Sequence, residues 1–343
     1  MKLFLNISTL ILFSLLFFAC KSDDPLSSGF TTSDKYYEWS VINSPASNFN
    51  HMSEGNDHSL FISGFQSFRI TDGTSQQINF NEPSFSPIYV DAYDKDYAVF
   101  LGYSYTPSDQ KTAIKIYDNG AIRTYNFTPW TTELLRVYID SRDKFYVYSI
   151  SWDSLYLFNN GIVTTIKVPE NNGYGNDAVF LMGKINSNLY FITSPTNGYI
   201  SDKVVYKILP TEIVRVVSDS TYGSSYNYTG SNFIRRTESF PSPYYHYANF
   251  TETGWIEFLA NDDYSILPTG TYPNNLVFFS NDTTNNYQAK VWNGTSLTTQ
   301  SNFPQGITYN QSSPGSFLTE FKNGSFYFYG YSSGAKLVKG TLK

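Results

Sequence analysis

The sequence predicts an all-β chain built from repeated antiparallel hairpins, and three observations support this fold class. The 343 residues include 30 Tyr and 28 Phe, whereas charged residues make up only 15% of the chain. Aromatic side chains favour pleated strands, while the Asn and Gly residues between the aromatic stretches favour tight turns. No segment after Tyr36 shows a convincing helical period, and similar stretches recur at intervals of about 40 to 50 residues.

The N-terminal residues 1–19 have the pattern of a secretory signal peptide. Lys2 supplies a positive charge, and residues 3–19 form a mostly apolar stretch that ends at the small residue Ala19. This stretch is too short to be a good membrane-spanning helix. We therefore exclude residues 1–19 from the folded domain.

The only cysteine of the chain, Cys20, follows this segment directly. Residues 17–20, Phe-Phe-Ala-Cys, resemble a bacterial lipobox. This resemblance implies that the signal peptide is cut before Cys20 and that a diacylglycerol is attached to its thiol. Acyl chains at Cys20 would hold the protein at a membrane, because each buried methylene adds about 0.8 kcal/mol of affinity.

Residues 20–35 are polar and contain Pro25, Ser27, Ser28 and Gly29, so we expect a flexible tether. Its acidic pair at 23–24 resembles the residues that follow the lipidated cysteine in lipoproteins displayed by diderm bacteria. We therefore expect a location in the cell envelope, at the outer membrane of a diderm bacterium, with the acylated cysteine as the membrane contact.

The clearest internal repeat links residues 88–97 (IYVDAYDKDY) with residues 137–146 (VYIDSRDKFY). In this alignment Asp91 corresponds to Asp140 and Asp94 to Asp143. Weaker copies lie at residues 181–190 and 318–327. Each copy has the pattern of a strand, a polar turn and a second strand with aromatic residues at alternate positions.

A second hairpin usually follows the first one. Asn-Gly or Asp-Gly turns at residues 71–73, 117–120, 158–161 and 292–294 each lead into another strand pattern. These dipeptides favour the turn conformations that match the twist of paired strands. Two successive hairpins make a four-stranded blade, and a ring of such blades is a β-propeller.

We expect about seven blades, with six or eight left open because residues 219–270 lack clear turn signals. The expected ranges are 48–80, 87–127, 134–168, 178–218, 230–268, 275–301 and 315–342. The sixth and seventh ranges look one strand short. We expect residues 36–42 to supply the outer strand of the last blade, so that the two chain ends pair and residues 36–343 form the propeller domain.

The repeated pattern apolar-Asp-x-x-Asp-Lys-x-Tyr at residues 88–97 and 137–146 resembles the repeats of NHL and sensor-type propellers. The resemblance covers these two units well. It implies the propeller fold and leaves the function open, because propellers include enzymes, binding proteins and scaffolds.

Asp91 and Asp140 are candidate ligand-binding residues, because carboxylates repeated at one blade position could ring the mouth of a central channel. There they could bind Ca²⁺ or a polar ligand. The alternative is a structural role, in which Asp94 and Asp143 close their turns by accepting backbone hydrogen bonds. With one cysteine and three histidines, a zinc centre of Cys and His ligands is close to excluded.

Aromatic residues in or near expected loops are further candidates. Flat rings beside polar side chains can bind sugars or proteins, whereas packing between blades is the alternative. The candidate contacts are Trp130, Trp152, Tyr244, Tyr245 and Tyr247.

The function classes can be narrowed but not reduced to one. The formal net charge is −6 with no basic stripe, which argues against a nucleic-acid partner. The sequence contains no phosphate-binding loop, and we expect no cofactor. It also contains no nucleophile elbow, and we name no catalytic residue. The leading hypothesis is a lipid-anchored, non-enzymatic envelope propeller that binds a protein or glycan. The alternatives are a polysaccharide hydrolase or lyase that uses channel carboxylates, and a structural subunit of an envelope assembly.

Overall fold

The computed structural model describes ten segments of the chain, and these segments contain β-strands joined by turns and loops. The described residues are 36–106, 109–126, 135–149, 154–169, 177–195, 203–221, 224–262, 265–281, 286–308 and 318–343. The prediction of an all-β fold is confirmed. No helix among these residues is long and apolar enough to cross a membrane.

Six sheets each consist of four consecutive antiparallel strands, and each sheet is one blade. The first blade contains β2 (His51–Glu54), β3 (Leu60–Ser63), β4 (Ser67–Thr71) and β5 (Thr74–Ile78). The second contains β6 (Phe85–Asp94), β7 (Tyr97–Thr106), β8 (Asp109–Asp118) and β9 (Ala121–Asn126). The third contains β10 (Leu135–Ser141), β11 (Lys144–Ser149), β12 (Ser154–Asn159) and β13 (Ile162–Lys167).

The next three blades repeat this order. The fourth contains β14 (Asp177–Ile185), β15 (Asn188–Pro195), β16 (Lys203–Ile208) and β17 (Ile213–Asp219). The fifth contains β18 (Ser225–Tyr228), β19 (Phe233–Glu238), β20 (Tyr245–Thr251) and β21 (Gly254–Asn261). The sixth contains β22 (Ser265–Gly270), β23 (Leu276–Asn281), β24 (Tyr287–Trp292) and β25 (Leu297–Thr299).

The seventh blade joins the two ends of the folded chain. Its strands are β26 (Ser325–Tyr331), β27 (Ala335–Leu342) and β1 (Tyr37–Asn43), and β1 pairs with β27 over its full length. Bridges from Leu318 to Phe328 and from Lys322 to Ser325 place residues 318–322 beside β26, at the inner strand position. The predicted closure of the ring by the N- and C-terminal strands is therefore confirmed.

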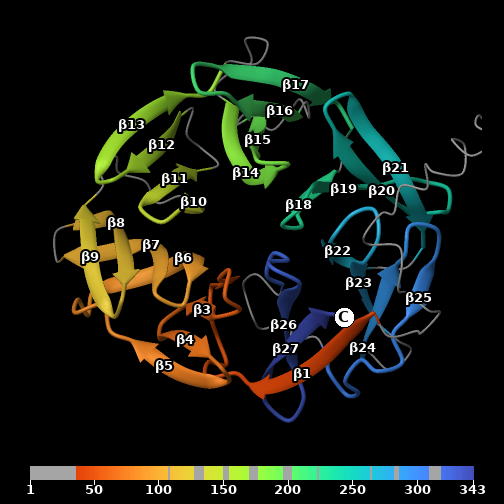
Figure 1. Cartoon of the computed structure of the whole chain (residues 1–343), viewed down its shortest axis with the longest axis horizontal. Coiled ribbons are helices and arrows are strands. Elements are labelled where there is room, and N and C mark those ends of the chain that lie inside the picture. Colours follow the sequence, from red (N-terminus) through yellow and green to blue (C-terminus); the bar gives the residue numbers. More distant parts are fainter. Residues whose placement is uncertain are drawn as a thin grey trace, which may run out of the picture. The chain divides into compact units, whose positions relative to one another are not determined.

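The seven blades form a ring in which the first strand of each blade lies nearest the centre (Figure 1). The predicted count of seven blades is confirmed, but two of the predicted ranges were wrong. Residues 265–270 form the first strand of the sixth blade, although the expected range 230–268 placed residues 265–268 in the fifth. The sixth blade therefore has four strands and is not one strand short.

Three of the four predicted Asn-Gly and Asp-Gly turns have positive φ at both residues, whereas in the turn at residues 292–294 only Gly294 does. Asp72, Asn119 and Asn160 have φ values of 50°, 50° and 49°, and each precedes a glycine that also has positive φ. Consecutive positive φ values suit the tight turn of a twisted hairpin, and glycine adopts them at little cost. These turns therefore fix the register of the third and fourth strands in their blades.

Aromatic side chains fill the spaces between neighbouring blades. Phe279 of the sixth blade stacks on Phe328 of the seventh with their ring centroids 4.4 Å apart. Tyr247 of the fifth blade meets Phe278 of the sixth edge to face at 4.9 Å. Burying rings of this size stabilises each interface by several kcal/mol, so the high Tyr and Phe content serves packing between blades.

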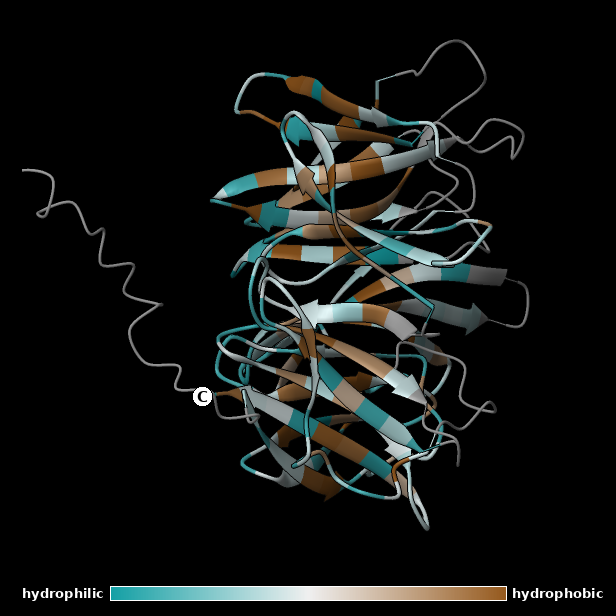
Figure 2. Cartoon of the chain, turned by 90° about the vertical axis from the view of Figure 1, so that its right-hand side faces the viewer, coloured by the Kyte–Doolittle hydropathy of each residue, from teal (hydrophilic) through white to brown (hydrophobic). Residues whose placement is uncertain are grey.

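The alternating direction of the strands gives the disc two different faces (Figure 2). We call one the turn face, because it carries the turns between first and second strands and between third and fourth strands, such as residues 95–96 and 119–120. We call the other the loop face, because it carries the connections between second and third strands and between blades, such as residues 64–66 and 239–244. The C-terminus, after β27, lies at the turn face (Figure 2).

Candidate functional site

A central cavity of about 220 Å³ lies among the inner strands, near the turn face. Six blades contribute to its lining, so it occupies the axis of the ring. The lining is mostly polar and mixes both signs of charge with phenol rings. Its charged residues are Asp91, Asp140, Lys184, Glu320 and Lys322, and its tyrosines are Tyr93, Tyr138 and Tyr228.

Asp91, on β6, is a saturated hydrogen-bond acceptor at the edge of this cavity. Its carboxylate accepts from Ser53 Oγ at 2.9 Å, from its neighbour Ala92 N at 2.9 Å and from Ile139 N of the next blade at 2.8 Å. Lys322 Nζ of the seventh blade lies 3.2 Å from the same carboxylate. Asp91 therefore joins blades one, two, three and seven as well as lining the cavity.

Asp140, the equivalent residue on β10, is held by two lysines. Lys144 Nζ and Lys184 Nζ each donate to its carboxylate at 2.7 Å. Burial acts to raise the pKa of Asp140, but the two lysine hydrogen bonds outweigh it and hold the pKa below its usual range. Lys184 stands at the matching position of the weaker repeat 181–190, so this blade-to-blade ion pair could have been found by aligning that copy.

Glu320, at the inner strand position of the seventh blade, was missed by the sequence analysis. Burial raises its pKa to about 8, and this effect is opposed by Lys322 and reinforced by Asp91. Burial therefore favours the protonated form of this carboxyl group. No motif in the sequence indicates this, because the effect arises only when several blades enclose the side chain.

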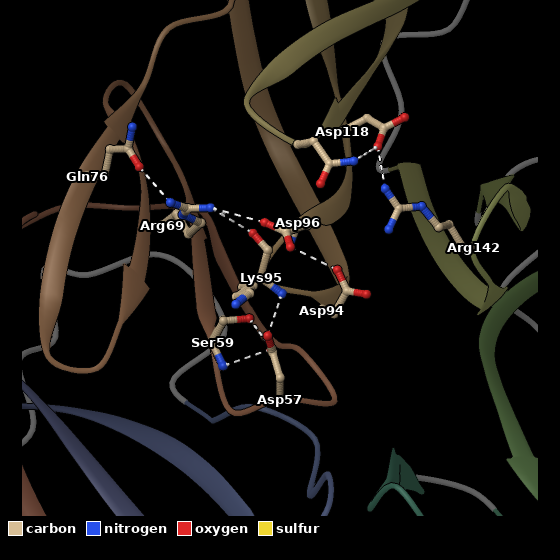
Figure 3. A network of polar contacts seen from close by, with 10 residues as sticks. Asp57, Ser59, Arg69, Gln76, Asp94, Lys95, Asp96, Asp118 and Arg142 are labelled. Atoms are coloured by element: carbon tan, nitrogen blue, oxygen red, sulfur yellow. Dashed lines mark hydrogen bonds and ion pairs between the residues drawn. The ribbon is translucent and has the colours of Figure 1, made fainter.

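The repeated turn residues on the turn face link blades to one another (Figure 3). Asp94 accepts a hydrogen bond from Asp96 N at 2.9 Å, as expected for a residue that closes its own turn. Asp57 of the first blade accepts from Lys95 N at 2.9 Å, and Arg69 donates to Lys95 O at 3.0 Å. The Asp-Lys repeat therefore contributes to the contact between the first and second blades.

The equivalent turn of the third blade makes a similar link. Asp143 lies in the turn with a φ of 61°, and its carboxylate accepts from Arg123 of the second blade at 2.8 Å. Arg142 beside it donates to Asp118 of the second blade at 2.5 Å (Figure 3). Asp94 and Asp143 thus have a structural role in their blades.

The described residues contain no group of three or more His, Cys, Asp or Glu side chains that could hold a metal ion. The oxygens of Asp91 and Asp140 accept from N–H and O–H donors, including lysine ammonium groups that a cation would have to displace. The Ca²⁺ site suggested by the repeated aspartates gains no support from this geometry.

The aromatic candidates fall into three groups. Tyr245 and Tyr247 lie on β20, are 6% and 0% exposed and pack between the fifth and sixth blades, so the packing alternative accounts for them. Tyr244 is half-buried at the end of the loop before β20. Trp130, Trp152 and the lipidation candidate Cys20 lie outside the described residues.

Four aromatic side chains that the sequence analysis did not single out are exposed on the loop face. They are Phe65, Phe240, Tyr105 and Tyr331, with 100%, 85%, 48% and 40% of their surface exposed. Phe65 and Phe240 lie in the connections between the second and third strands of their blades. Tyr105 and Tyr331 lie at the ends of the second strands, where these connections begin. The other large hydrophobic side chains that are exposed in the described segments, Val41, Ile162, Val163, Val214 and Ile256, are aliphatic and lie on outer strands.

The loop that carries Phe240 is fixed by several contacts. The Phe240 ring meets the Tyr244 ring edge to face at 4.8 Å. Tyr244 N donates to Asp262 at 2.7 Å, and Ser242 Oγ donates to the same carboxylate. Ser239 N donates to Tyr244 O at 2.9 Å, so the loop is closed at its base. Phe240 is therefore presented to solvent by an ordered loop.

No protein-family model and no curated protein matches this chain. Among solved structures, YCF48 bound to the D1 peptide is similar with a TM-score of 0.58 at 10% identity, over 89% of this chain and 95% of that chain. A chain of the mitotic checkpoint complex gives a TM-score of 0.56 at 11% identity, over 92% and 98% of the two chains.

The extracellular domain of BT4673 from B. thetaiotaomicron gives a TM-score of 0.51 at 16% identity. That alignment covers 88% of this chain and 40% of that one. Identities this low establish the β-propeller fold alone. They add nothing to the resemblance of the two repeat units to NHL and sensor-type propellers.

Proposed function

We propose that this chain is a lipid-anchored β-propeller of the cell envelope that binds a protein partner with its loop face and catalyses no reaction. A glycan partner on the same face is the competing outcome. The single observation that carries the proposal is the set of four exposed aromatic side chains at equivalent connections of four blades.

Exposed rings in these positions suit a protein interface. Aromatic residues are enriched among the side chains that dominate binding energy, and they are depleted from surfaces that contact only water. Phe65 and Phe240 expose 100% and 85% of their surface, although burial of a phenylalanine is favourable by about 1.5–3 kcal/mol. Because the rings come from blades one, two, five and seven, they are spread over the face, which favours a partner with a broad surface over a single sugar ring.

The structural neighbours supply precedent for the fold in this role. A propeller with the same architecture, YCF48, was solved bound to a peptide, and another is part of the mitotic checkpoint complex. These proteins show that a propeller disc can serve as a binding platform. The choice of a protein partner for this chain depends on its own exposed rings.

The anchor is supported by sequence alone. The lipobox-like residues 17–20 and the polar residues 20–35 precede the first strand, β1, which begins at Tyr37. A multiply acylated Cys20 would hold the propeller at a membrane without a spanning helix. The proposed location is the outer membrane of a diderm bacterium.

Serine replacement of Phe65, Tyr105, Phe240 and Tyr331 together tests the loop face. We expect the variant to fold normally, because exposed side chains contribute little to stability, and to lose its partner in co-purification after mild crosslinking. The matched control replaces Ile162 and Ile256, which are 70% and 53% exposed on outer strands, by serine. Equal recovery of the partner with both variants would contradict the proposal.

A polysaccharide hydrolase or lyase is the second candidate, and one observation favours it. The central cavity contains carboxyl groups whose pKa values are moved apart, with Glu320 at about 8 and Asp140 below its usual range. Such a pair can divide the roles of acid and base. Release of new reducing ends from a polysaccharide, lost in E320Q, would establish this candidate in place of the first.

A further inference from the structure

Glu320 differs from every other charged side chain of the central cavity. Asp91 is paired with Lys322, and Asp140 is paired with Lys184 and Lys144. Glu320 has no hydrogen bond or ion pair with any residue in the described part of the chain, and its partly exposed side chain lines the cavity. A carboxyl group that faces a cavity and has no protein partner is available to hydrogen-bond with a ligand.

The backbone around Glu320 is held from two sides, so the side chain is kept at the cavity. On one side, Thr319 N donates to Tyr327 O at 2.9 Å. On the other, Phe321 N donates to Thr229 O of the fifth blade at 3.2 Å. The approach there is so close that a Cβ on Gly230 would lie 1.8 Å from Phe321 O. Glycine at position 230 is therefore required to seat this segment against the fifth blade.

The charges of the cavity balance, and this balance sets the class of ligand. Three carboxyl groups are matched by three lysines, because Asp91 pairs with Lys322 and Asp140 pairs with both Lys184 and Lys144. Burial raises the pKa of Glu320 so that its protonated form is favoured. A protonated carboxyl offers one O–H donor and one carbonyl acceptor, which match a hydroxyl group. Tyr138 of the third blade and Tyr228 of the fifth add aromatic surface to the lining of the cavity.

We propose that the central cavity binds a neutral, hydroxyl-bearing ligand of the saccharide class, with the Glu320 carboxyl hydrogen-bonded to a ligand hydroxyl. A cation would be repelled by the ammonium groups of Lys184 and Lys322. An anion would be repelled by the carboxylates of Asp91 and Asp140. The site lies near the turn face, so it is separate from the protein-binding role of the loop face.

The test titrates the purified protein with the methyl glycosides of glucose, galactose, mannose and N-acetylglucosamine, and with methylammonium and acetate as charged probes. Saturation-transfer NMR detects binding, and calorimetry measures the affinity. We expect at least one glycoside to bind. E320Q, which keeps a neutral donor and acceptor, should bind within about threefold of the original protein, whereas E320A should bind about tenfold more weakly.

Two further variants separate a local effect from a general loss of folding. N56A changes a cavity-lining side chain but keeps the backbone hydrogen bonds of Asn56 with Tyr93 and Asn323, and it should also weaken glycoside binding. I162S, on the outer strand β13, should leave glycoside binding unchanged. The proposal is overturned if no glycoside binds, if E320A and N56A both bind as well as the original protein, or if only methylammonium binds and E320Q abolishes that binding.

Discussion

Asp91 on β6 accepts a hydrogen bond at 2.8 Å from the backbone N–H of Ile139 on β10, so a side chain of one blade binds the inner strand of the next. The same carboxylate receives Lys322 from the seventh blade. The repeated aspartate is therefore a connector around the central cavity, whereas the second aspartate of the repeat, Asp94, closes its own turn.

D91A should destabilise the propeller strongly. The change removes the ion pair with Lys322 and the hydrogen bonds from Ser53 and Ile139, which join three other blades to the second, so we expect a loss of about 3–5 kcal/mol in the free energy of unfolding. D94A in the same repeat should cost about 1 kcal/mol, because it removes one hydrogen bond in a turn. Urea unfolding of both variants measures the difference. Equal losses for the two would show that Asp91 does not connect the blades as described.

The first strand should be essential and the residues before it dispensable. A chain that begins at Tyr36 retains β1, with Tyr37 buried and its hydroxyl donating to Asn275 O at 2.6 Å. A chain that begins at Ser44 lacks Tyr37 and Trp39, and removing each of these large rings costs about 3–5 kcal/mol. Thermal unfolding should give the first chain the melting temperature of the full chain. An unchanged melting temperature for the second chain would mean that β1 does not close the ring.

Stability should fall as pH rises from about 7 to about 8.5. Burial raises the pKa of Glu54 to about 7 and that of Glu320 to about 8, so the folded state keeps protons that the unfolded state has released. This stabilisation is complete below the ordinary pKa of 4.5 and is lost as pH rises through the folded values. His51 has a lowered pKa of about 3 and acts in the opposite sense, but mainly below its ordinary value of 6.5.

We expect a loss of roughly 1–2 kcal/mol in the free energy of unfolding over this range. The double variant E54Q/E320Q mimics the protonated acids, so its stability should be nearly constant over the same range. Urea unfolding at several pH values measures both proteins. A slope that persists unchanged in the double variant would assign the pH dependence to other groups.

Cys20→Ser should abolish labelling of the protein by a fatty-acid probe and should release the propeller from membranes. The thiol is the proposed attachment point for the diacylglycerol, and a serine hydroxyl does not replace it in that reaction. Ser22→Ala, two residues away, should leave both labelling and membrane recovery unchanged. Normal labelling of the Cys20→Ser protein would contradict the proposed anchor.

Most of the fold could be predicted from the sequence because the residues that form the tight turns are adjacent in the chain. Pairs such as Asp72-Gly73 and Asn119-Gly120 favour positive φ through their own side chains, so they mark hairpins without knowledge of the rest of the chain. The fifth blade could not be delimited in this way. Its first turn is closed by Thr229, which pairs with Asn232 through both its backbone and its hydroxyl group. That combination is a weaker sequence signal.

The candidate sites were predictable only in part. The repeat predicted that Asp91 and Asp140 would lie around a central channel, and both residues line the central cavity. This position follows because equivalent positions in a ring of blades face the same axis. Tyr245 and Tyr247 are two residues apart on β20 and face the same buried side, so a period of two would have indicated packing. The unpartnered state of Glu320 depends on strands from distant blades and has no local signal.

The most direct test of the central claim places a photo-crosslinking amino acid at Phe65 or Phe240 on the loop face, and at Lys95 or Thr253 on the turn face. All four positions are exposed, so each side chain can reach a partner. Crosslinking in intact cells, followed by separation of the products by mass, detects a bound protein. We predict a discrete protein adduct from positions 65 and 240 and none from positions 95 and 253. The same adduct from both faces, or no protein adduct from positions 65 and 240, would contradict a protein-binding role for the loop face.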